Sequence, residues 1–137
     1  YAAPLRPDLT VIAFGMNDKC PGDTFRDNIL HIMESIRSVH PNAEFILVSS
    51  IQFNRRWRTE EGFLYKAAFQ DTLRQMQCPG VAFADIWQLH GDLLKRKRYA
   101  DMTGNHVNHP NDFLARCYAH AIVHLLGGDT KTQNSES

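Results

Sequence analysis

The sequence predicts an α/β fold in which a parallel sheet lies between helices. Three nearly continuous apolar runs, typical of strands buried on both faces, occupy residues 9–14, 43–50 and 81–86. Each run is followed by a segment whose apolar residues recur at helical spacing. Because parallel neighbours must be joined by crossover connections, this alternation predicts one parallel sheet with helices on both faces. In such folds ligands bind beyond the carboxyl ends of the strands.

The first two predicted helices each have a start and a stop signal. Asp23 or Thr24 can cap the helix after the first strand, and Pro41 ends it. Thr59 opens the second helix, and Pro79 followed by glycine breaks it. The apolar stripe of the first helix comprises Phe25, Ile29, Ile32, Met33, Ile36 and Val39, and that of the second comprises Tyr65, Phe69, Leu73 and Met76.

The last third of the chain predicts two further helices separated by a polar loop. A weaker helical segment spans residues 87–97, and the loop occupies residues 99–111. Asp112 is the predicted cap of the last helix, which two glycines end. The apolar stripe of that helix comprises Leu114, Cys117, Tyr118, Ala121, Ile122 and Leu125. These elements predict one domain, residues 1–128, and a polar tail, residues 129–137, that we expect to be disordered.

Composition excludes several classes of protein. Of the 137 residues, 43% are hydrophobic, which is close to the globular average, and fifteen basic residues balance fifteen acidic ones. A nucleic-acid binder usually carries a basic excess, so we expect no nucleic-acid partner. No apolar run approaches the ~20 residues of a membrane span. Cys20, Cys78 and Cys117 form no Cys-x-x-Cys pair, and no glycine-rich phosphate motif is present, so we expect no cofactor.

Two polar loops carry residues capable of chemistry. The loop after the first strand reads Gly-Met-Asn-Asp, and the amide of Asn17 could stabilise an oxyanion or simply bond to the backbone in a turn. The loop before the last helix contains Asp101, His106 and His109. His109 lies near the positive end of that helix, which favours a neutral imidazole that can act as a base. Alternatively, these three residues could bind a metal ion, or the histidines could be incidental in a surface loop.

Together the two loops resemble two sequence blocks of the SGNH hydrolases, also called GDSL esterases. Residues 15–18 are similar to their Gly-x-Asn-Asp block, and residues 108–111, Asn-His-Pro-Asn, are similar to the end of their Asp-x-x-His-Pro block. The resemblance covers residues 7–127 and implies a three-layer, flavodoxin-like sheet, of which this chain holds the later three strands. It makes His109 the catalytic base and Asn17 an oxyanion-hole donor. It also places Gly15, Met16, His106 and Asn108 around the substrate.

The chain departs from the family pattern in two places. It contains no Gly-Asp-Ser block, and Ser49 and Ser50 end a strand other than the family's nucleophile strand. We therefore expect the nucleophile in an N-terminal part absent from this chain, and we expect the chain alone to be inactive. The family's aspartate, three residues before the histidine, is replaced by His106. The group that orients His109 is then, in order of expectation, the carbonyl of His106 or of a loop neighbour, Asp101, and the His106 ring.

The resemblance implies a serine esterase that acts on small acyl esters, with O-acetyl groups on carbohydrate as one option. Two alternatives remain: a non-catalytic binding or structural domain on the same fold, and a metal-dependent hydrolase that uses the loop of His106 and His109. The sheet edge beside the first strand should be covered by the missing N-terminal segment or by a second chain, because open apolar edges associate. The resemblance also favours a secreted or periplasmic location.

Overall fold

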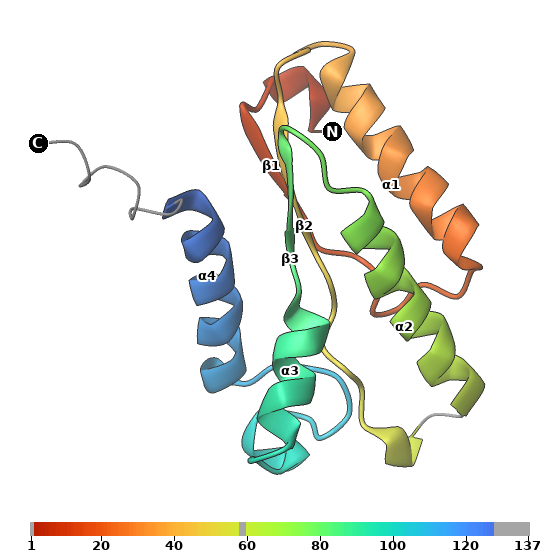
Figure 1. The fold of residues 1–137 in the computed structure, drawn as a ribbon, viewed down its shortest axis with the longest axis vertical. Helices are drawn as coiled ribbons and strands as arrows, with labels where there is room; N and C mark the ends of the chain where they lie inside the picture. The colour runs from red at the N-terminus through yellow and green to blue at the C-terminus, as the bar shows by residue number, and fades with distance from the viewer. Residues whose placement is uncertain (1, 58–59, 128–137) are drawn as a thin grey trace, which may run out of the picture.

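Three parallel strands form the sheet (Figure 1). A computed structural model describes residues 2–57 and 60–127, so Thr59 and the predicted tail, residues 129–137, lie outside the described residues. The strands β1 (Leu9–Ile12), β2 (Glu44–Val48) and β3 (Val81–Ala84) are neighbours in the order β1-β2-β3. The predicted α/β fold with a parallel sheet is confirmed.

Each strand is shorter than predicted because its last residues leave the sheet. The pairing of β1 with β2 ends where Ile12 lies opposite Leu47, and the chain then turns into the loop of Gly15. After β3, Asp85 accepts a hydrogen bond from the Gln88 N–H (2.9 Å) and so caps a helix where strand was expected.

Two helices cover one face of the sheet (Figure 1). The helix α1 (Gly22–Arg37) joins β1 to β2, and α2 (Glu60–Gln75) joins β2 to β3. The rings of Phe25 in α1 and Phe69 in α2 stack with their centroids 4.1 Å apart. The buried residues of both helices pack on Ile12, Phe45, Leu47, Val81 and Phe83 of the sheet.

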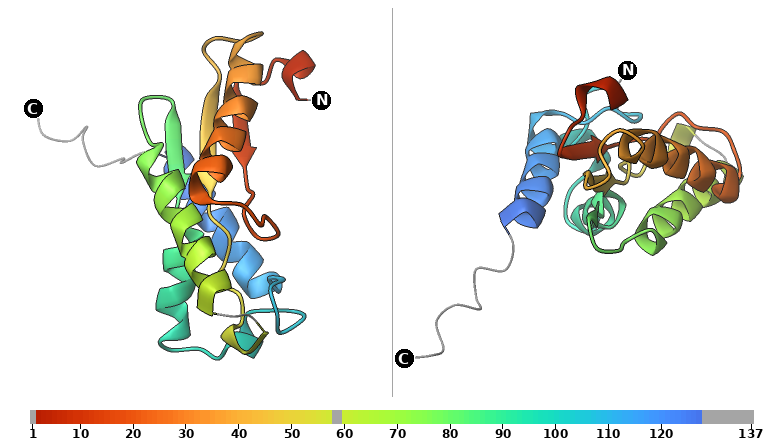
Figure 2. Two further views of the ribbon diagram at one scale, coloured as in Figure 1. Left: turned by 90° about the vertical axis from the view of Figure 1, so that its right-hand side faces the viewer. Right: turned by 90° about the horizontal axis from the view of Figure 1, so that it is seen from above.

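The opposite face is covered by α4 (Asp112–Gly127), and α3 (Ile86–Leu94) extends beyond the end of β3 (Figures 1 and 2). The core on this side comprises Ile46, Val48, Ile51, Ala84, Ile86, Met102 and Leu114. The sheet therefore lies between two layers of helices, as predicted. Among the described residues no helix is both long and apolar enough to cross a membrane.

The helix caps differ from the predicted ones. Asp23 accepts a hydrogen bond from the adjacent Thr24 N–H (2.7 Å) and does not cap α1, which begins at Gly22 without a side-chain cap. The cap of α4 is Asn111, whose Oδ1 accepts a hydrogen bond from the Leu114 N–H (3.2 Å). The predicted cap, Asp112, is the first residue of the helix. At α4 the difference arises because two neighbouring polar side chains, Asn111 and Asp112, can compete for the same backbone donors.

The buried stripe predicted for α2 is correct at Phe69 and Leu73 and wrong at its first position, Tyr65. Tyr65 is 45% exposed, whereas Lys66 is only 7% exposed and shares a face with the buried Phe69 and Leu73. The last residues predicted for the stripes of the first and last helices, Val39 and Leu125, are also exposed.

The strand β1 lies at an edge of the sheet. It pairs with β2, and within the described part of the chain no strand pairs with its other edge. Leu9 and Val11 on β1 are 38% and 46% exposed, and Phe14 just beyond it is 55% exposed. The expected open apolar edge is therefore present, and what covers it stays a prediction.

Candidate active site

Three segments gather beyond the carboxyl ends of the strands. Residues 13–21 follow β1, and residues 49–57 follow β2 and include the short helix η2 (Arg55–Trp57). The loop between α3 and α4, which contains η3 (Tyr99–Asp101), is bonded to the segment after β2. Asn54 donates from its N–H to the carbonyl of Val107 (3.0 Å) and from Nδ2 to the carbonyl of His106 (2.8 Å). These bonds bring the histidine loop to the ligand-binding end of the sheet.

The loop of residues 15–18 is closed by a hydrogen bond between its ends. The Gly15 N–H donates to Oδ2 of Asp18 (3.0 Å). Gly15 is buried with a φ of +110°, and a Cβ there would lie 3.5 Å from the rings of Phe25 and Phe69, so glycine is strongly favoured. Asn17, between the fixed ends, is exposed. Its amide is therefore open to a ligand, as an oxyanion donor must be.

Lys66 of α2 binds both ends of this loop. Its Nζ donates to the carbonyl of Gly15 (2.6 Å) and to the carbonyl of Asp18, and it lies 4.9 Å from the centroid of the Phe69 ring. Sequence analysis missed Lys66 because a lysine is expected at the surface. The signal that could have found it is its spacing, three and seven residues before Phe69 and Leu73, which places it on the buried stripe.

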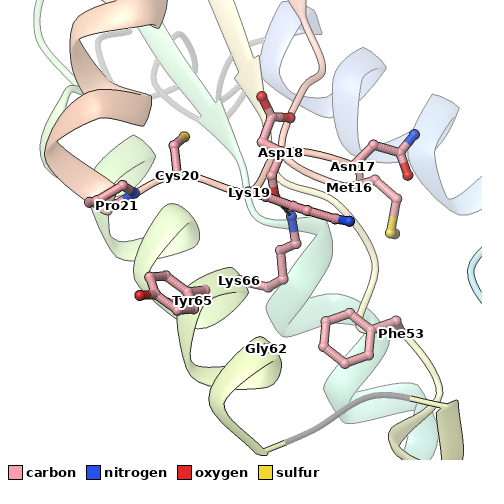
Figure 3. A pocket seen from close by; sticks show the side chains of 10 residues that line it. All are labelled: Met16, Asn17, Asp18, Lys19, Cys20, Pro21, Phe53, Gly62, Tyr65 and Lys66. Atoms are coloured by element: carbon pink, nitrogen blue, oxygen red, sulfur yellow. Dashed lines mark hydrogen bonds between the residues drawn. The ribbon is translucent and has the colours of Figure 1, made fainter.

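A pocket of about 650 Å³ opens between this loop and α2 (Figure 3). Phe53 from the segment after β2 and Tyr65 from α2 contribute aromatic walls, and the loop contributes Met16, Asn17 and Lys19. Polar and apolar groups contribute about equally to its walls. The pocket therefore provides room for a substrate next to the amide of Asn17.

The backbone around His109 is organised by the side chain of Asn105. Oδ1 of Asn105 accepts from the N–H groups of Val107 (3.0 Å), Asn108 (3.0 Å) and His109 (2.9 Å), and its Nδ2 donates to Oδ1 of Asn108 (3.0 Å). His106 turns the chain with a φ of +58°. Sequence analysis assigned no role to Asn105. An asparagine within a polar loop was the available signal, because such side chains often bond to the following backbone.

The ring of His109 is exposed, and the expected orienting groups have other partners. The carboxylate of Asp101 lies 2.8 Å from Nη2 of Arg98 and accepts from the Arg98 N–H (3.1 Å), and these bonds hold the pKa of Asp101 below its ordinary value. The carbonyl of His106 accepts from Asn54. Within residues 2–57 and 60–127, no hydrogen bond or ion pair joins the His109 imidazole to Asp101 or to His106. The group that orients His109 therefore stays a prediction.

The two loops meet at a second cavity, of about 290 Å³. Phe14 and Met16 line it from the loop after β1, and Asn108 and Pro110 line it from the histidine loop. Ser50, after β2, also borders this cavity. The direct neighbours of Asn17 and His109 thus share one cavity.

Ser49 has a structural role. It is 3% exposed, and its Oγ accepts from the Trp87 N–H (2.9 Å) and lies 3.5 Å from the carbonyl oxygen of Ala84. The hydroxyl therefore links the end of β2 to the start of α3.

A buried histidine, His90, and a half-buried tyrosine, Tyr99, contact the backbone of these loops. The hydroxyl of Tyr99 lies within hydrogen-bond distance of the carbonyl oxygens of Gln52 (2.9 Å) and Val107 (2.7 Å). The ring of His90 packs against Tyr99 edge to face with a centroid distance of 5.4 Å, and its Nδ1 accepts from the Gln52 N–H (3.1 Å). Burial lowers the pKa of His90 to about 4 and raises the pKa of Tyr99, so both are neutral at pH 7.

The structure gathers no evident metal-ligand set. Among the described residues, no three or more His, Cys, Asp or Glu side chains lie close enough together to hold a metal ion. Asp101 is turned to Arg98, so it does not form the expected group with His106 and His109.

Several solved structures share this fold, although no family model and no curated protein matches the sequence. A carbohydrate esterase of family 3 from Talaromyces cellulolyticus superposes with a TM-score of 0.67 at 19% identity, over 89% of this chain and 58% of that one. A mutant of Axe2, an acetyl-xylooligosaccharide esterase from Geobacillus, superposes with a TM-score of 0.72 at 15% identity, over 88% of this chain and 59% of that one. The salicylyl-acyltransferase SsfX3 superposes with a TM-score of 0.62 at 18% identity, over 93% of this chain and 41% of that one. The chain has the fold of these esterases.

This likeness confirms, at the level of the fold, the resemblance to SGNH hydrolases drawn from the two loops. The chain spans about three fifths of the length of the two esterases. The reaction and the substrate of the whole protein are therefore proposals.

Proposed function

We propose that this chain forms the oxyanion-hole and general-base side of an ester hydrolase for small acyl esters. The observation that carries the proposal is the shared cavity, because Met16, next to Asn17, and Asn108, next to His109, line the same space. An ester carbonyl bound there would lie between the residues that flank the Asn17 amide and those that flank the His109 imidazole. Ester hydrolysis uses both kinds of group.

In the proposed reaction a serine hydroxyl attacks the ester carbonyl and gives its proton to His109. The amide of Asn17 donates a hydrogen bond to the oxyanion of the tetrahedral intermediate, which lowers the barrier by about 3–4 kcal/mol. His109 then protonates the leaving alcohol, and water repeats the sequence to release the acid. Gly15, Met16, His106 and Asn108 surround the reacting group in this proposal.

We place the nucleophile on a segment or second chain that pairs with the open edge of β1. Ser49 is excluded because its hydroxyl is buried and already bonded. A parallel strand added beside β1 would end next to Gly15, since the carboxyl ends of parallel strands meet at one edge of the sheet. A serine at the end of that strand would face Asn17.

Acetyl esters of carbohydrate are the substrate class that the structural neighbours support. The Talaromyces protein is described as a carbohydrate esterase and Axe2 as an acetylxylan esterase. Two Axe2 structures are described as catalytic mutants, one at a histidine and one at an aspartate three positions earlier in the chain. In our proposal His109 takes the role of that histidine, and His106 occupies the position of the aspartate.

Hydrolysis of p-nitrophenyl acetate by the full-length protein tests the proposal. His109→Ala should remove nearly all turnover, and Asn17→Ala should lower kcat by about 10²-fold to 10³-fold. A serine-directed inhibitor should abolish activity, whereas a chelator should leave it unchanged. His120→Ala, at an exposed position of α4, is the matched control and should keep wild-type activity. The 137-residue chain alone should be inactive.

Other outcomes separate the alternatives. An inactive full-length protein would favour a non-catalytic binding domain. The ring of His109, which has no hydrogen-bond partner among the described residues, favours the same alternative. Loss of activity with chelator would indicate a metal-dependent hydrolase. Activity of this chain alone that disappears in Ser50→Ala would put the nucleophile in the smaller cavity and contradict its placement beside β1.

A further inference from the structure

Lys66 is a cation inside the helix layer, and its burial is tied to the loop of Asn17. Its side chain is 7% exposed and lies over Phe69, which is itself stacked on Phe25. Burying an ammonium group is costly unless it is hydrogen-bonded. The carbonyls of Gly15 and Asp18 accept two of its hydrogen bonds, so the loop stabilises Lys66 as much as Lys66 holds the loop.

These bonds fix both ends of a very short segment. At one end the Gly15 N–H is bonded to Asp18 Oδ2 and the Gly15 carbonyl to Lys66. At the other end the Asp18 carbonyl is bonded to the same ammonium. Only Met16 and Asn17 lie between the fixed points, so the backbone that carries the Asn17 amide has little freedom to move.

We propose that Lys66 is a positioning residue that sets the Asn17 amide for oxyanion stabilisation by holding the backbone of residues 15–18. This inference rests on the proposed esterase function. Lys66 does not need to touch the substrate, because it acts through the two carbonyls. An oxyanion donor is effective only when it is already placed before the charge develops, and a displacement of about 1 Å can cost about 10²-fold in rate.

The test is a double-mutant cycle between Lys66 and Asn17 in the full-length protein. Lys66→Met keeps the aliphatic stem and removes the donors, and it should lower kcat by about 10-fold to 100-fold while KM changes by less than about twofold. In the Asn17→Ala background the same change should have almost no further effect on kcat, because the positioned group is gone. Lys95→Met, at an exposed site directly after α3, is the matched control and should behave as wild type. An unchanged kcat in Lys66→Met, or losses that multiply in the double variant, would overturn the proposal.

A second variant covers the case in which Lys66→Met does not fold. Asp18→Ala leaves Lys66 in place but removes the oxygen that accepts from the Gly15 N–H, so it releases the same loop from its other anchor. It should lower kcat in the same range and should also be non-additive with Asn17→Ala. Wild-type kcat in a folded Asp18→Ala protein would contradict the proposal.

Amide exchange separates failure of this inference from failure of the esterase proposal. The Gly15 amide should exchange at least about 10-fold faster in Lys66→Met than in Lys95→Met, whether or not the protein hydrolyses esters. Unchanged exchange would overturn the positioning role by itself. If the full-length protein has no esterase activity but the exchange is faster in Lys66→Met, Lys66 still anchors the loop. The esterase function is then wrong, and so is the catalytic role of the anchor.

Discussion

Acidification below about pH 6.5 should destabilise the protein through one buried histidine, His90. Its side chain is 0% exposed, its Nδ1 accepts from the Gln52 N–H (3.1 Å), and its Nε2 has no hydrogen-bond partner among the described residues. Burial lowers the pKa of His90 from the ordinary 6.5 to about 4. A proton on Nδ1 would also displace the Gln52 N–H, so the charged form does not fit the folded structure.

The sign and size of the effect follow from proton linkage. Well above pH 6.5 the imidazole is neutral in both the folded and the unfolded states, so it adds no pH dependence there. Between about pH 6.5 and pH 4 the unfolded chain binds a proton that the folded chain does not, so the free energy of unfolding falls as the pH falls. At about 1.36 kcal/mol per pH unit, the full loss is about 3 kcal/mol, a large part of the stability of a small domain.

Urea denaturation of the wild type and His90→Asn between about pH 7.5 and pH 4.5 measures this effect. Asparagine keeps an acceptor near the position of Nδ1 but does not titrate, so the wild type should lose about 2.5 kcal/mol more than the variant over this range. The carboxylates are the same in both proteins, and their contribution cancels in the difference. His120→Asn, an exposed histidine on α4, should keep the wild-type slope. Equal pH slopes in the wild type and His90→Asn would refute the reasoning.

Two further substitutions test the histidine loop. Asn105→Ala removes the acceptor of three backbone N–H groups. It should lower kcat at least about 10-fold in ester hydrolysis, and it should lower the free energy of unfolding by about 1–2 kcal/mol in urea denaturation. Unchanged kinetics would show that the loop keeps its shape without Asn105. Asp101→Asn should lower kcat less than about threefold, because its carboxylate is bonded to Arg98. A loss that rivals His109→Ala in the same assay would make Asp101 the third member of a triad.

The strands and helices could be predicted because their signals are local. A run such as Phe45 to Val48 has no polar residue, and a strand buried on both faces is the structure that accommodates it. The ends of elements were less predictable, because Asn111 and Asp112 are both good caps and only the folded backbone decides between them. The two site loops could be located because each follows a strand or precedes a helix with a clear pattern.

The bonds that shape the candidate site join residues far apart in the chain, which is why the sequence did not reveal them. Lys66 and Gly15 are separated by 51 positions, and Tyr99 and Gln52 by 47. The apolar pattern also assigns Tyr65 to the buried stripe. Lys66 has the spacing of that stripe, but a lysine is ordinarily expected at the surface. The burial of His90 could not be predicted either, because a buried histidine without a charged partner leaves no signal in the sequence.

The two sides of the proposed site are held in different ways, and the difference matches what each must do. The oxyanion side has a buried anchor, Lys66, which fixes the backbone on both sides of Asn17. The base side has an exposed anchor, Asn105, which fixes the backbone of His109 but makes no bond to its ring. Oxyanion stabilisation requires donors that are in place before the reaction, whereas the hydrogen bonds of a general base often tighten only when substrate is bound. In the proposed site the chain thus holds the donor rigidly, and it leaves the last adjustment of the imidazole to the substrate.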